Sequence, residues 1–250
     1  MTDRNHMEGF AREIWAWYAR HKRELPWRDL RIKDDTQRAY MVLVSEIMLQ
    51  QTQVPRVIII FRQFLDRFPT VKDLAKASNK EVILAWRGMG YNSRALRLRD
   101  AAKVILDTHA GVFPKDMEEL LAIKGVGPYT AAAIRNFAFN IPTPCIDTNI
   151  RRILHRSFIG PERADGTWEA SDKELLIIAE ELLDVALDGG KDHDAKMARR
   201  ARHESFFPKD AANWHAALMD FGSIVCTKTS PKWDMCPLTA NGLMKAAYKG

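Results

Sequence analysis

Apolar residues recur along this chain at the spacing of a helix face. In residues 8–22, Phe10, Ile14, Trp15 and Tyr18 fall on one side of a helix among charged neighbours. No segment alternates apolar and polar residues as a half-buried strand would. The pattern therefore predicts an all-α fold. With proline, glycine and capping residues as boundaries, the predicted helices cover residues 8–22, 38–51, 54–68, 71–77, 79–87, 93–110, 116–123, 128–139, a segment starting after Asp147, 172–187 and 211–225.

The segments between these helices differ in character. Residues 29–37 are polar and are predicted to form a loop, as are residues 160–169. Residues 189–210 are charged and show little apolar periodicity, so we expect an exposed, mobile insertion there. The tail from Cys226 onward is also expected to be a loop.

Residues 121–137, LAIKGVGPYTAAAIRNF, join two of the predicted helices through a short glycine-containing turn. Gly125 and Gly127 let the backbone turn through φ > 0 without a Cβ clash, and Pro128 suits the first position of the next helix. The first amides of that helix point outward at its positive end. The segment fits a helix–hairpin–helix clamp for a nucleic-acid phosphate, and it equally fits an ordinary corner between two helices.

Composition narrows the class of protein. With 250 residues and 46% hydrophobic residues, the chain can form a full core, and two small domains are expected. An excess of 38 Lys+Arg over 32 Asp+Glu favours an acidic partner such as nucleic acid. The three cysteines do not make a disulfide framework, which indicates a reducing compartment. The longest apolar run, Val57–Leu65, is too short to span a membrane, and residues 1–10 contain no apolar signal segment. We expect a cytoplasmic protein without a membrane partner.

Glu46 occupies an unusual place for a carboxylate. Its helical neighbours are Val42, Leu43, Leu49 and Gln50, of which three are apolar. The carboxylate should therefore lie on or beside the buried stripe, where its pKa should rise unless a partner is present. A general acid that works near neutral pH needs a pKa raised in this way. A boundary glutamate that reaches solvent or caps another helix is the alternative.

Asp147 is placed differently. It precedes the predicted helical segment that starts with Thr148 and Asn149, so it suits the N-cap position. Capping favours the ionised carboxylate. Two carboxylates in opposed environments suggest that an acid and a base are divided between Glu46 and Asp147. A purely structural N-cap is the alternative for Asp147.

Several motifs, in one order along the chain, give it a family resemblance. The chain resembles the helix–hairpin–helix–GPD superfamily of base-excision DNA glycosylases, and most of all the catalytic domain of the MutY-type adenine DNA glycosylases. The motifs are LPWR (25–28), SEIMLQQTQV (45–54), RFPTVKDLA (67–75), GMGYNSRA (88–95), KGVGPYTAAAI (124–134), IDTNIRRIL (146–154) and ALMDFGSIVC (217–226).

The resemblance implies a fold of two helical lobes with a DNA-binding cleft between them. The six-helix module with the hairpin would cover residues 32–142. Residues 1–31 and 143–250 would form the second lobe, built from both ends of the chain.

The resemblance also implies roles for individual residues. Glu46 would protonate adenine and orient or activate water, and Asp147 would stabilise the positive charge that develops on the deoxyribose. Asn149 would steady Asp147, and Arg28 with Glu46 would contact the flipped base. Tyr129 stands where relatives with strand-cleaving activity carry a lysine that forms a Schiff base. A phenol cannot do so, which predicts a monofunctional glycosylase.

Two turns and the hairpin are implied to contact DNA. Gln51 and Tyr91 would probe the gap and the opposite strand, with Met89 beside them, although Tyr91 could instead serve only in packing. Lys124 would contact phosphate, or be a solvated turn lysine. The expected DNA-binding set is Arg28, Gln51, Thr52, Met89, Tyr91, Lys124, Gly125, Val126, Gly127 and Thr130.

The chain departs from the family pattern near its carboxyl end. The family usually carries an iron–sulfur cluster on a C-x6-C-x2-C-x5-C run, and here Cys226 and Cys236 occupy the first and third places. Trp233 and Gly242 occupy the others. Two thiolates cannot hold a four-iron cluster, so we expect no cluster and no metal, with Trp233 filling the space. A monovalent cation at the hairpin is left open. The chain also stops short of the family's domain that reads 8-oxoguanine, which leaves the preferred base opposite adenine open.

The sequence predicts a monofunctional base-excision-repair enzyme that flips out mispaired adenine, opposite guanine or 8-oxoguanine, and removes it by hydrolysis. We expect it to act as a monomer on double-stranded DNA with a mismatched or damaged pair, at the nucleoid. One alternative is a glycosylase that removes thymine from T·G pairs. Another is an endonuclease III-like enzyme, against which Tyr129 argues. An alternative of a different class is a non-catalytic DNA-binding helical module.

Overall fold

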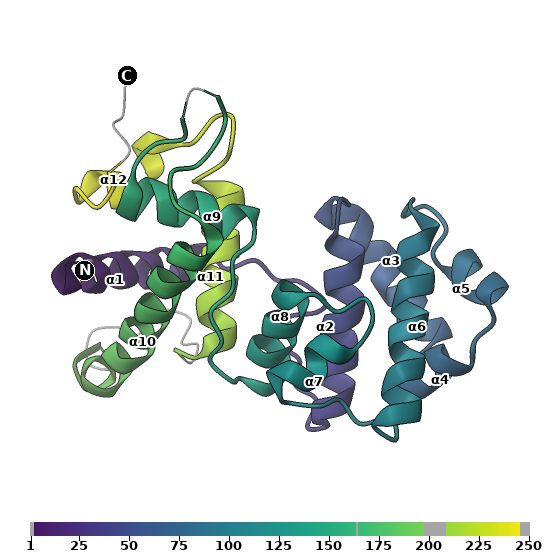
Figure 1. Cartoon of the computed structure of the whole chain (residues 1–250). Helices are drawn as coiled ribbons and strands as arrows, with labels where there is room; N and C mark the ends of the chain where they lie inside the picture. Colours follow the sequence, from purple (N-terminus) through teal and green to yellow (C-terminus); the bar gives the residue numbers. More distant parts are fainter. Residues whose placement is uncertain (1–2, 164, 198–208, 246–250) are drawn as a thin grey trace. The chain divides into compact units, whose positions relative to one another are not determined.

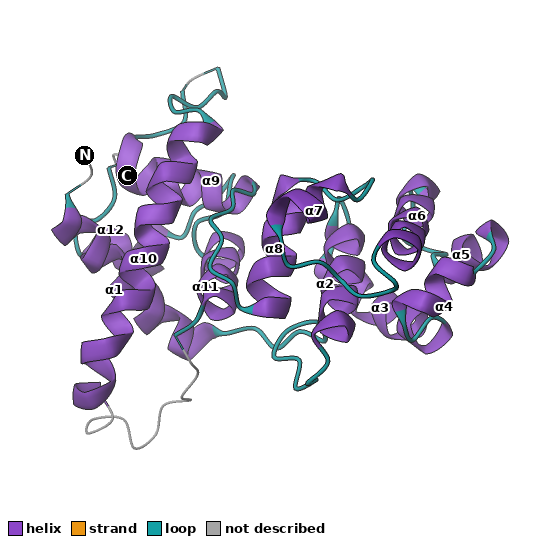
Figure 2. Cartoon of the chain, turned by 60° about the horizontal axis from the view of Figure 1, so that its bottom comes forward, coloured by secondary structure: helices purple, strands orange, loops and turns teal. Residues whose placement is uncertain are grey.

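A computed structural model gives the fold and describes residues 3–163, 165–197 and 209–245 (Figure 1). Every residue in these ranges lies in a helix or a loop, and none lies in a strand (Figure 2). The predicted all-α class is confirmed. In the same ranges, no helix combines the length and the apolar character that a membrane span needs.

The chain divides into two compact units. The first contains Met1–Arg23 and Pro142–Gly250, and the second contains Glu24–Ile141. The resemblance placed these divisions between residues 31 and 32 and between residues 142 and 143. Because both ends of the chain belong to the first unit, the second unit is an insertion between α1 and α9.

The second unit contains the helices that the apolar pattern predicted between residues 38 and 139. Serine, threonine or aspartate caps four of them, two as reciprocal capping boxes, Thr70 with Asp73 and Ser78 with Glu81. The helices are α2 (Asp35–Leu49), α3 (Val54–Arg67), α4 (Val71–Lys76), α5 (Asn79–Ala85), α6 (Asn92–Thr108), α7 (Met117–Ala122) and α8 (Pro128–Phe139).

One hydrophobic core holds these helices together. In Figure 1, α2 lies beside α8 and α4 lies beside α6, and both pairs are in contact. Trp86, Phe61 and Phe64 are almost fully buried between the helices. Each side chain of this size stabilises the fold by about 2–3 kcal/mol through the apolar surface it removes from water. The core therefore fixes the ends of α2, α5 and α7, from which the candidate site is built.

The first unit packs around α1 (Arg4–His21). This helix contacts α10 (Asp172–Met197) and α11 (Ala211–Ile224), and α11 also contacts α9 (Thr148–Leu154). Phe10, Trp15 and Trp214 are buried at the centre. The remaining elements are the π-helical turn η1 (His155–Ile159), the 3-10 turn η2 (Trp233–Met235) and α12 (Pro237–Ala240).

Two predictions for this unit were wrong. The pattern predicted that a helix ends at residue 187 and that a charged insertion follows over 189–210, but α10 continues to Met197. Residues 198–208 of that insertion lie outside the described residues. Residues 188–197 read DGGKDHDAKM and contain no apolar period, which is why the pattern missed the last turns. The tail was expected to be a loop, yet it contains η2 and α12.

Candidate active site

Glu46 lies on the buried face of α2. Its side chain is only 8% exposed, and Val42, Leu43 and Ile47 around it are buried. The prediction that this carboxylate lies at the apolar stripe is confirmed. Glu46 belongs to the second unit.

Asp147, in the first unit, is the N-cap of α9. One carboxylate oxygen, Oδ1, accepts the amide of Ile150 at 2.6 Å. The other, Oδ2, accepts a bond from the side-chain amide of Asn149 at 3.1 Å. The predicted cap and the expected contact with Asn149 are both present, so the carboxylate is held through both of its oxygens.

The electrostatics of Asp147 differ from what capping alone predicts. Partial burial raises the pKa of Asp147 above its ordinary value, and this effect exceeds the lowering by the bonds from Ile150 and Asn149 and by the charge of Arg152. The lowering by the capping bonds is the effect that the sequence predicted. The sequence did not reveal the opposing effect, which comes from how far this helix start is shielded from water.

Arg152, which sequence reasoning missed, orients Asn149. It donates to Asn149 Oδ1 at 2.8 Å and to the carbonyl oxygens of Gly222 at 2.8 Å and Cys226 at 2.5 Å. Arginine only donates hydrogen bonds, so Asn149 must turn its oxygen to Arg152 and its NH₂ to Asp147. A Cβ on Gly222 would lie 2.7 Å from Asn149 Cβ. Glycine at residue 222 therefore lets α11 approach the amide closely.

The hairpin between α7 and α8 forms as predicted, with one difference. The amide of Val126 donates to the carbonyl of Ile123 at 2.9 Å, and Gly125 adopts φ +99°. Gly127 was also expected at φ > 0 but has φ −91° and ψ 174°. A Cβ on Gly127 would meet no heavy atom of the described residues within 4 Å. Neither backbone strain nor internal packing therefore requires glycine at residue 127. A group that approaches this backbone from outside would require it.

The predicted hairpin residues divide into an exposed and a buried set. Lys124, Gly125 and Gly127 are exposed, while the side chains of Val126 and Thr130 are buried. Val126 and Thr130 can thus offer an outside partner their backbone but not their side chains. Pro128 takes the first helical position as predicted, and among the described residues no side chain caps the start of α8. Tyr129, the second residue of α8, is half-buried.

The turns that hold Gln51 and Tyr91 both use left-handed backbone. Gln51 has φ 57° and is exposed. Tyr91, the N-cap of α6, has φ 49° and a side chain that is 68% exposed. Such a conformation costs a non-glycine residue about 1–2 kcal/mol. Both side chains are therefore exposed on turns whose backbone is strained.

The other residues of the expected set lie at the edges of these turns. Thr52 and Arg28 are half-buried, and the amide of Arg28 donates to the carbonyl of Leu25 at 3.0 Å. Met89 was expected beside DNA, but its side chain is 5% exposed and belongs to the core. The core of the second unit takes up this side chain, so only the backbone of Met89 is available at the turn.

The cysteine region does not fit a four-iron cluster. Cys226 and Cys236 are both buried, and burial raises the pKa of the Cys226 thiol. The guanidinium of Arg156 lies over the ring of Trp233 at 5.4 Å and donates to Cys226 Sγ at 3.4 Å. Two thiols with an arginine against one of them cannot provide four thiolate ligands. Within the described residues, no group of three or more His, Cys, Asp or Glu side chains could hold a metal ion.

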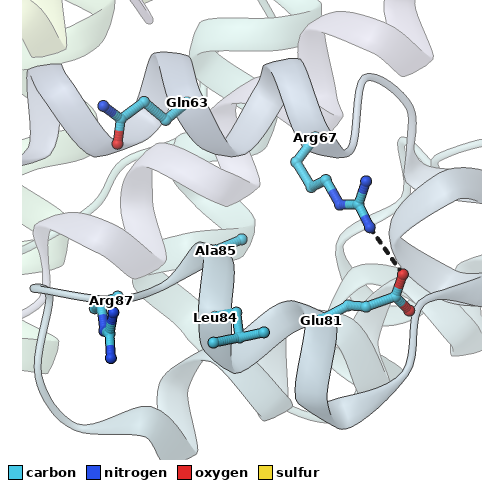
Figure 3. Close-up of a pocket in the computed structure, with 6 residues that line it drawn as sticks. All are labelled: Gln63, Arg67, Glu81, Leu84, Ala85 and Arg87. Atoms are coloured by element: carbon cyan, nitrogen blue, oxygen red, sulfur yellow. Dashed lines mark hydrogen bonds and ion pairs between the residues drawn. The ribbon is translucent and has the colours of Figure 1, made fainter.

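A pocket of about 510 Å³ lies between α3 and α5. Figure 3 shows Gln63 and Arg67 from α3 on one side and Glu81, Leu84 and Ala85 from α5 on the other, with Arg87 beyond. An ion pair between Arg67 and Glu81, at 3.0 Å, crosses the pocket. The six described residues that line it include none of the predicted site residues, so this pocket is separate from the candidate site.

Comparison with known families identifies the class. Residues 44–176 match the model of the HhH-GPD superfamily of base excision DNA repair proteins. The matched segment begins just before Glu46 and extends past Asp147. The chain belongs to this superfamily.

Individual relatives carry a more specific name. The chain is 36% identical over 229 residues to the adenine DNA glycosylase of Mycolicibacterium smegmatis, and the matched region covers 91% of this chain and 67% of the relative. It is 35% identical over 233 residues to the adenine DNA glycosylase of Homo sapiens, and the matched region covers 92% of this chain and 38% of the relative. The chain thus corresponds to one part of each of these relatives.

Solved structures show the same fold. A thermostable thymine-DNA glycosylase superposes with a TM-score of 0.75 at 25% identity, over 96% of this chain and 95% of that one. A non-covalent endonuclease III–DNA complex superposes with a TM-score of 0.69 at 19% identity, over 98% and 96% of the two chains. The second likeness shows the fold alone.

Proposed function

We propose that this chain is an adenine DNA glycosylase that flips adenine out of a mispair with guanine or 8-oxoguanine and hydrolyses its N-glycosidic bond. The observation that carries the proposal is Asp147, whose two oxygens are fixed by Ile150 and Asn149 at the start of α9. A carboxylate fixed in this way is suited to a sugar that becomes positively charged. The relatives named adenine DNA glycosylase support adenine as the base removed.

The chemistry divides between the two carboxylates. Glu46, as the carboxylic acid, gives its proton to the adenine ring, and the electrons of the glycosidic bond leave with the base. Asp147 stays ionised and stabilises the oxocarbenium-like sugar. Water then adds its oxygen to the sugar carbon and its proton returns to Glu46, which restores the starting state. The buried setting of Glu46 supports the first role.

DNA binding is proposed to use the hairpin and the two turns. The hairpin would hold a backbone phosphate through the amides that begin α8 and through Lys124. The open space beside Gly127 supports a close approach of that phosphate. Gln51 and Tyr91 would fill the gap that the flipped adenine leaves, which an extruded base requires.

Two further features follow from the same proposal. Tyr129 stands in place of the lysine of strand-cleaving relatives, so the enzyme leaves an abasic site and an unbroken strand. The two-cysteine region, packed by Arg156 and Trp233, supports an enzyme without an iron–sulfur cluster. Iron and sulfide analysis of protein expressed with ample iron should find neither in stoichiometric amount. Four irons per chain would overturn this part.

The proposal is tested with duplexes that contain a single A·G or A·8-oxoguanine pair. We expect free adenine to appear, strand breaks to appear only after alkali, and no covalent adduct to form with borohydride. Matched A·T duplex serves as the control. Intact adenine in both mispairs under single-turnover conditions would contradict the proposal, and strand breaks without alkali would contradict monofunctional action.

A second candidate is removal of thymine from T·G pairs. The structural likeness to a thymine-DNA glycosylase at 25% identity favours it. The same set of duplexes, extended with a T·G pair, separates the two candidates. Release of thymine but not adenine would establish this alternative.

A further inference from the structure

Arg94 has no role in the reaction described so far, yet it is one of the most deeply buried charged side chains in the second unit. It lies on the first turns of α6 and is 3% exposed. Burial lowers the pKa of Arg94, and the nearby charge of Arg97 adds to this effect. Burying a guanidinium is costly unless its donors find acceptors. The acceptors of Arg94 show which segments its guanidinium connects.

One nitrogen of the guanidinium binds the end of α2. Nη1 donates to the carbonyl oxygens of Ile47 at 3.3 Å and Met48 at 3.2 Å, and also to that of Gln50. The last carbonyls of a helix have no partner within the helix and carry its negative end. Arg94 therefore caps the carboxyl end of α2 immediately before Gln51.

The other nitrogen binds both turns. Nη2 donates to Thr52 Oγ1 at 3.1 Å, which follows Gln51, and to the carbonyl oxygens of Met89 at 2.9 Å and Gly90 at 3.3 Å, which precede Tyr91. One planar group thus joins two segments separated by about forty residues of sequence. The ring of Tyr91 lies 5.6 Å from the guanidinium carbon, and the ring of Trp86 lies 5.7 Å from it.

The two turns need such a connection. Gln51 and Tyr91 both hold left-handed backbone that is unfavourable for their side chains. Each turn has local bonds, from the Thr52 amide to the carbonyl of Leu49 at 3.4 Å and from Trp86 Nε1 to the carbonyl of Gly90 at 3.1 Å. These bonds act within one turn, whereas the bonds of Arg94 join the two turns. Within the described residues, Arg94 Nε is buried without a partner, and the guanidinium makes its bonds to the turns through Nη1 and Nη2.

We propose that Arg94 is a positioning residue that fixes the spacing of the Gln51 and Tyr91 turns, so that both side chains enter the duplex together at a mispair. The inference rests on the proposed function for its DNA partner. It adds that recognition of the mispair depends on a buried arginine that itself touches no DNA.

The test compares Arg94→Met with Arg99→Met, an arginine of the same helix that pairs with Asp100. Affinity is measured for an A·G duplex whose adenosine carries a 2′-fluorine, which blocks excision, and for the matched duplex. We expect the ratio of the two affinities to fall about tenfold in Arg94→Met and to stay unchanged in Arg99→Met. A ratio does not respond to the folded fraction, so a merely structural loss would leave it unchanged.

A second readout follows the duplex itself. 2-Aminopurine beside the mispair should brighten when the wild-type protein unstacks the strand, and this signal should be lost in Arg94→Met. Arg94→Lys should recover part of the ratio, because an ammonium offers three donors but cannot span both turns. Thr52→Val, which removes one acceptor, should lower the ratio about threefold.

The outcomes test the proposed function and the role of Arg94 independently. A wild-type protein that discriminates and unstacks the mispair but releases no adenine overturns the proposed function and leaves the inference standing. An active wild type whose ratio is unchanged in Arg94→Met overturns the inference. If Arg94→Met does not fold, unchanged ratios in both Arg94→Lys and Thr52→Val overturn it as well.

Discussion

Arg94 on α6 and Arg152 on α9 are both almost fully buried, and both donate to carbonyl oxygens at the ends of helices. Their other acceptors differ. Arg94 binds the backbone and one hydroxyl of two exposed turns, whereas Arg152 binds the side chain of Asn149, which in turn binds the carboxylate of Asp147. The same residue type thus joins two turns in one unit and, in the other, orients the partner of a carboxylate and slightly lowers the pKa of that carboxylate.

Experiments can separate an effect of position from an effect of charge. A guanidinium that binds neutral carbonyls acts through position, so its loss should change recognition without moving a pH profile. A guanidinium linked to a carboxylate also acts through its charge, so its loss should move the pH profile.

The largest effect should come from the carboxylates themselves. Asp147→Asn and Glu46→Gln should each lower the single-turnover rate of adenine release about 10³-fold, because one removes the charge that stabilises the sugar and the other the proton donor. Binding to the A·G duplex should persist in both. Glu180→Gln, an exposed position on α10, is the matched control. Full activity in either variant would remove that carboxylate from the mechanism.

Arg152→Met should lower the same rate by about 10–100-fold, as the loss of a partner behind a catalytic group commonly does. Burial already raises the pKa of Asp147, and the charge of Arg152 opposes that rise. Without Arg152 the pKa should rise further, so less of Asp147 is ionised at a given pH. The acid limb of the rate profile should therefore move to higher pH. Arg94→Met, measured alongside, should leave the position of that limb unchanged.

The two arginines also show where sequence reasoning reached its limit. The helices of the second unit could be predicted because apolar period, proline and capping residues agree, and α8 has the predicted bounds. In the sequence, Arg94 is one of three arginines on the helix predicted over 93–110, with Arg97 and Arg99. It shares a helix face with Leu98, Ala101 and Ile105, which are buried, and this spacing is the signal that could have revealed a buried arginine.

Other differences have physical causes that a pattern does not record. The inward side chain of Met89 and the ordinary φ of Gly127 depend on how a turn is closed by distant residues. Arg152 reaches Gly222 and Cys226 some seventy positions away in the sequence, a contact that no local spacing predicts. Apolar spacing and capping singled out Glu46 and Asp147, and the resemblance added Asn149, but none of these signals could reveal what orients the side chains.

Substitutions at two glycines should separate the effect of internal packing from the effect of contact with DNA. Gly222→Ala should lower the rate about tenfold and the free energy of unfolding by about 1–3 kcal/mol, because the new methyl group would meet Asn149 at 2.7 Å. Gly127→Ala has open space and should lower the free energy of unfolding by no more than about 1 kcal/mol. It should nevertheless weaken DNA binding about tenfold. Thermal melting and duplex titration measure the two effects, and unchanged DNA affinity in Gly127→Ala would argue against the hairpin as a phosphate site.

The smallest effect is expected for Lys124→Ala in the exposed part of the hairpin. Loss of one phosphate contact should weaken matched and A·G duplexes equally and reduce the slope of log affinity against log salt by about 0.9. Lys76→Ala, an exposed lysine at the end of α4, should leave the slope unchanged. Arg94→Met should show the opposite behaviour, with an unchanged slope and a changed ratio of affinities. If Lys124→Ala changed that ratio, the hairpin would take part in recognising the mispair, and the division between holding DNA and reading it would fail.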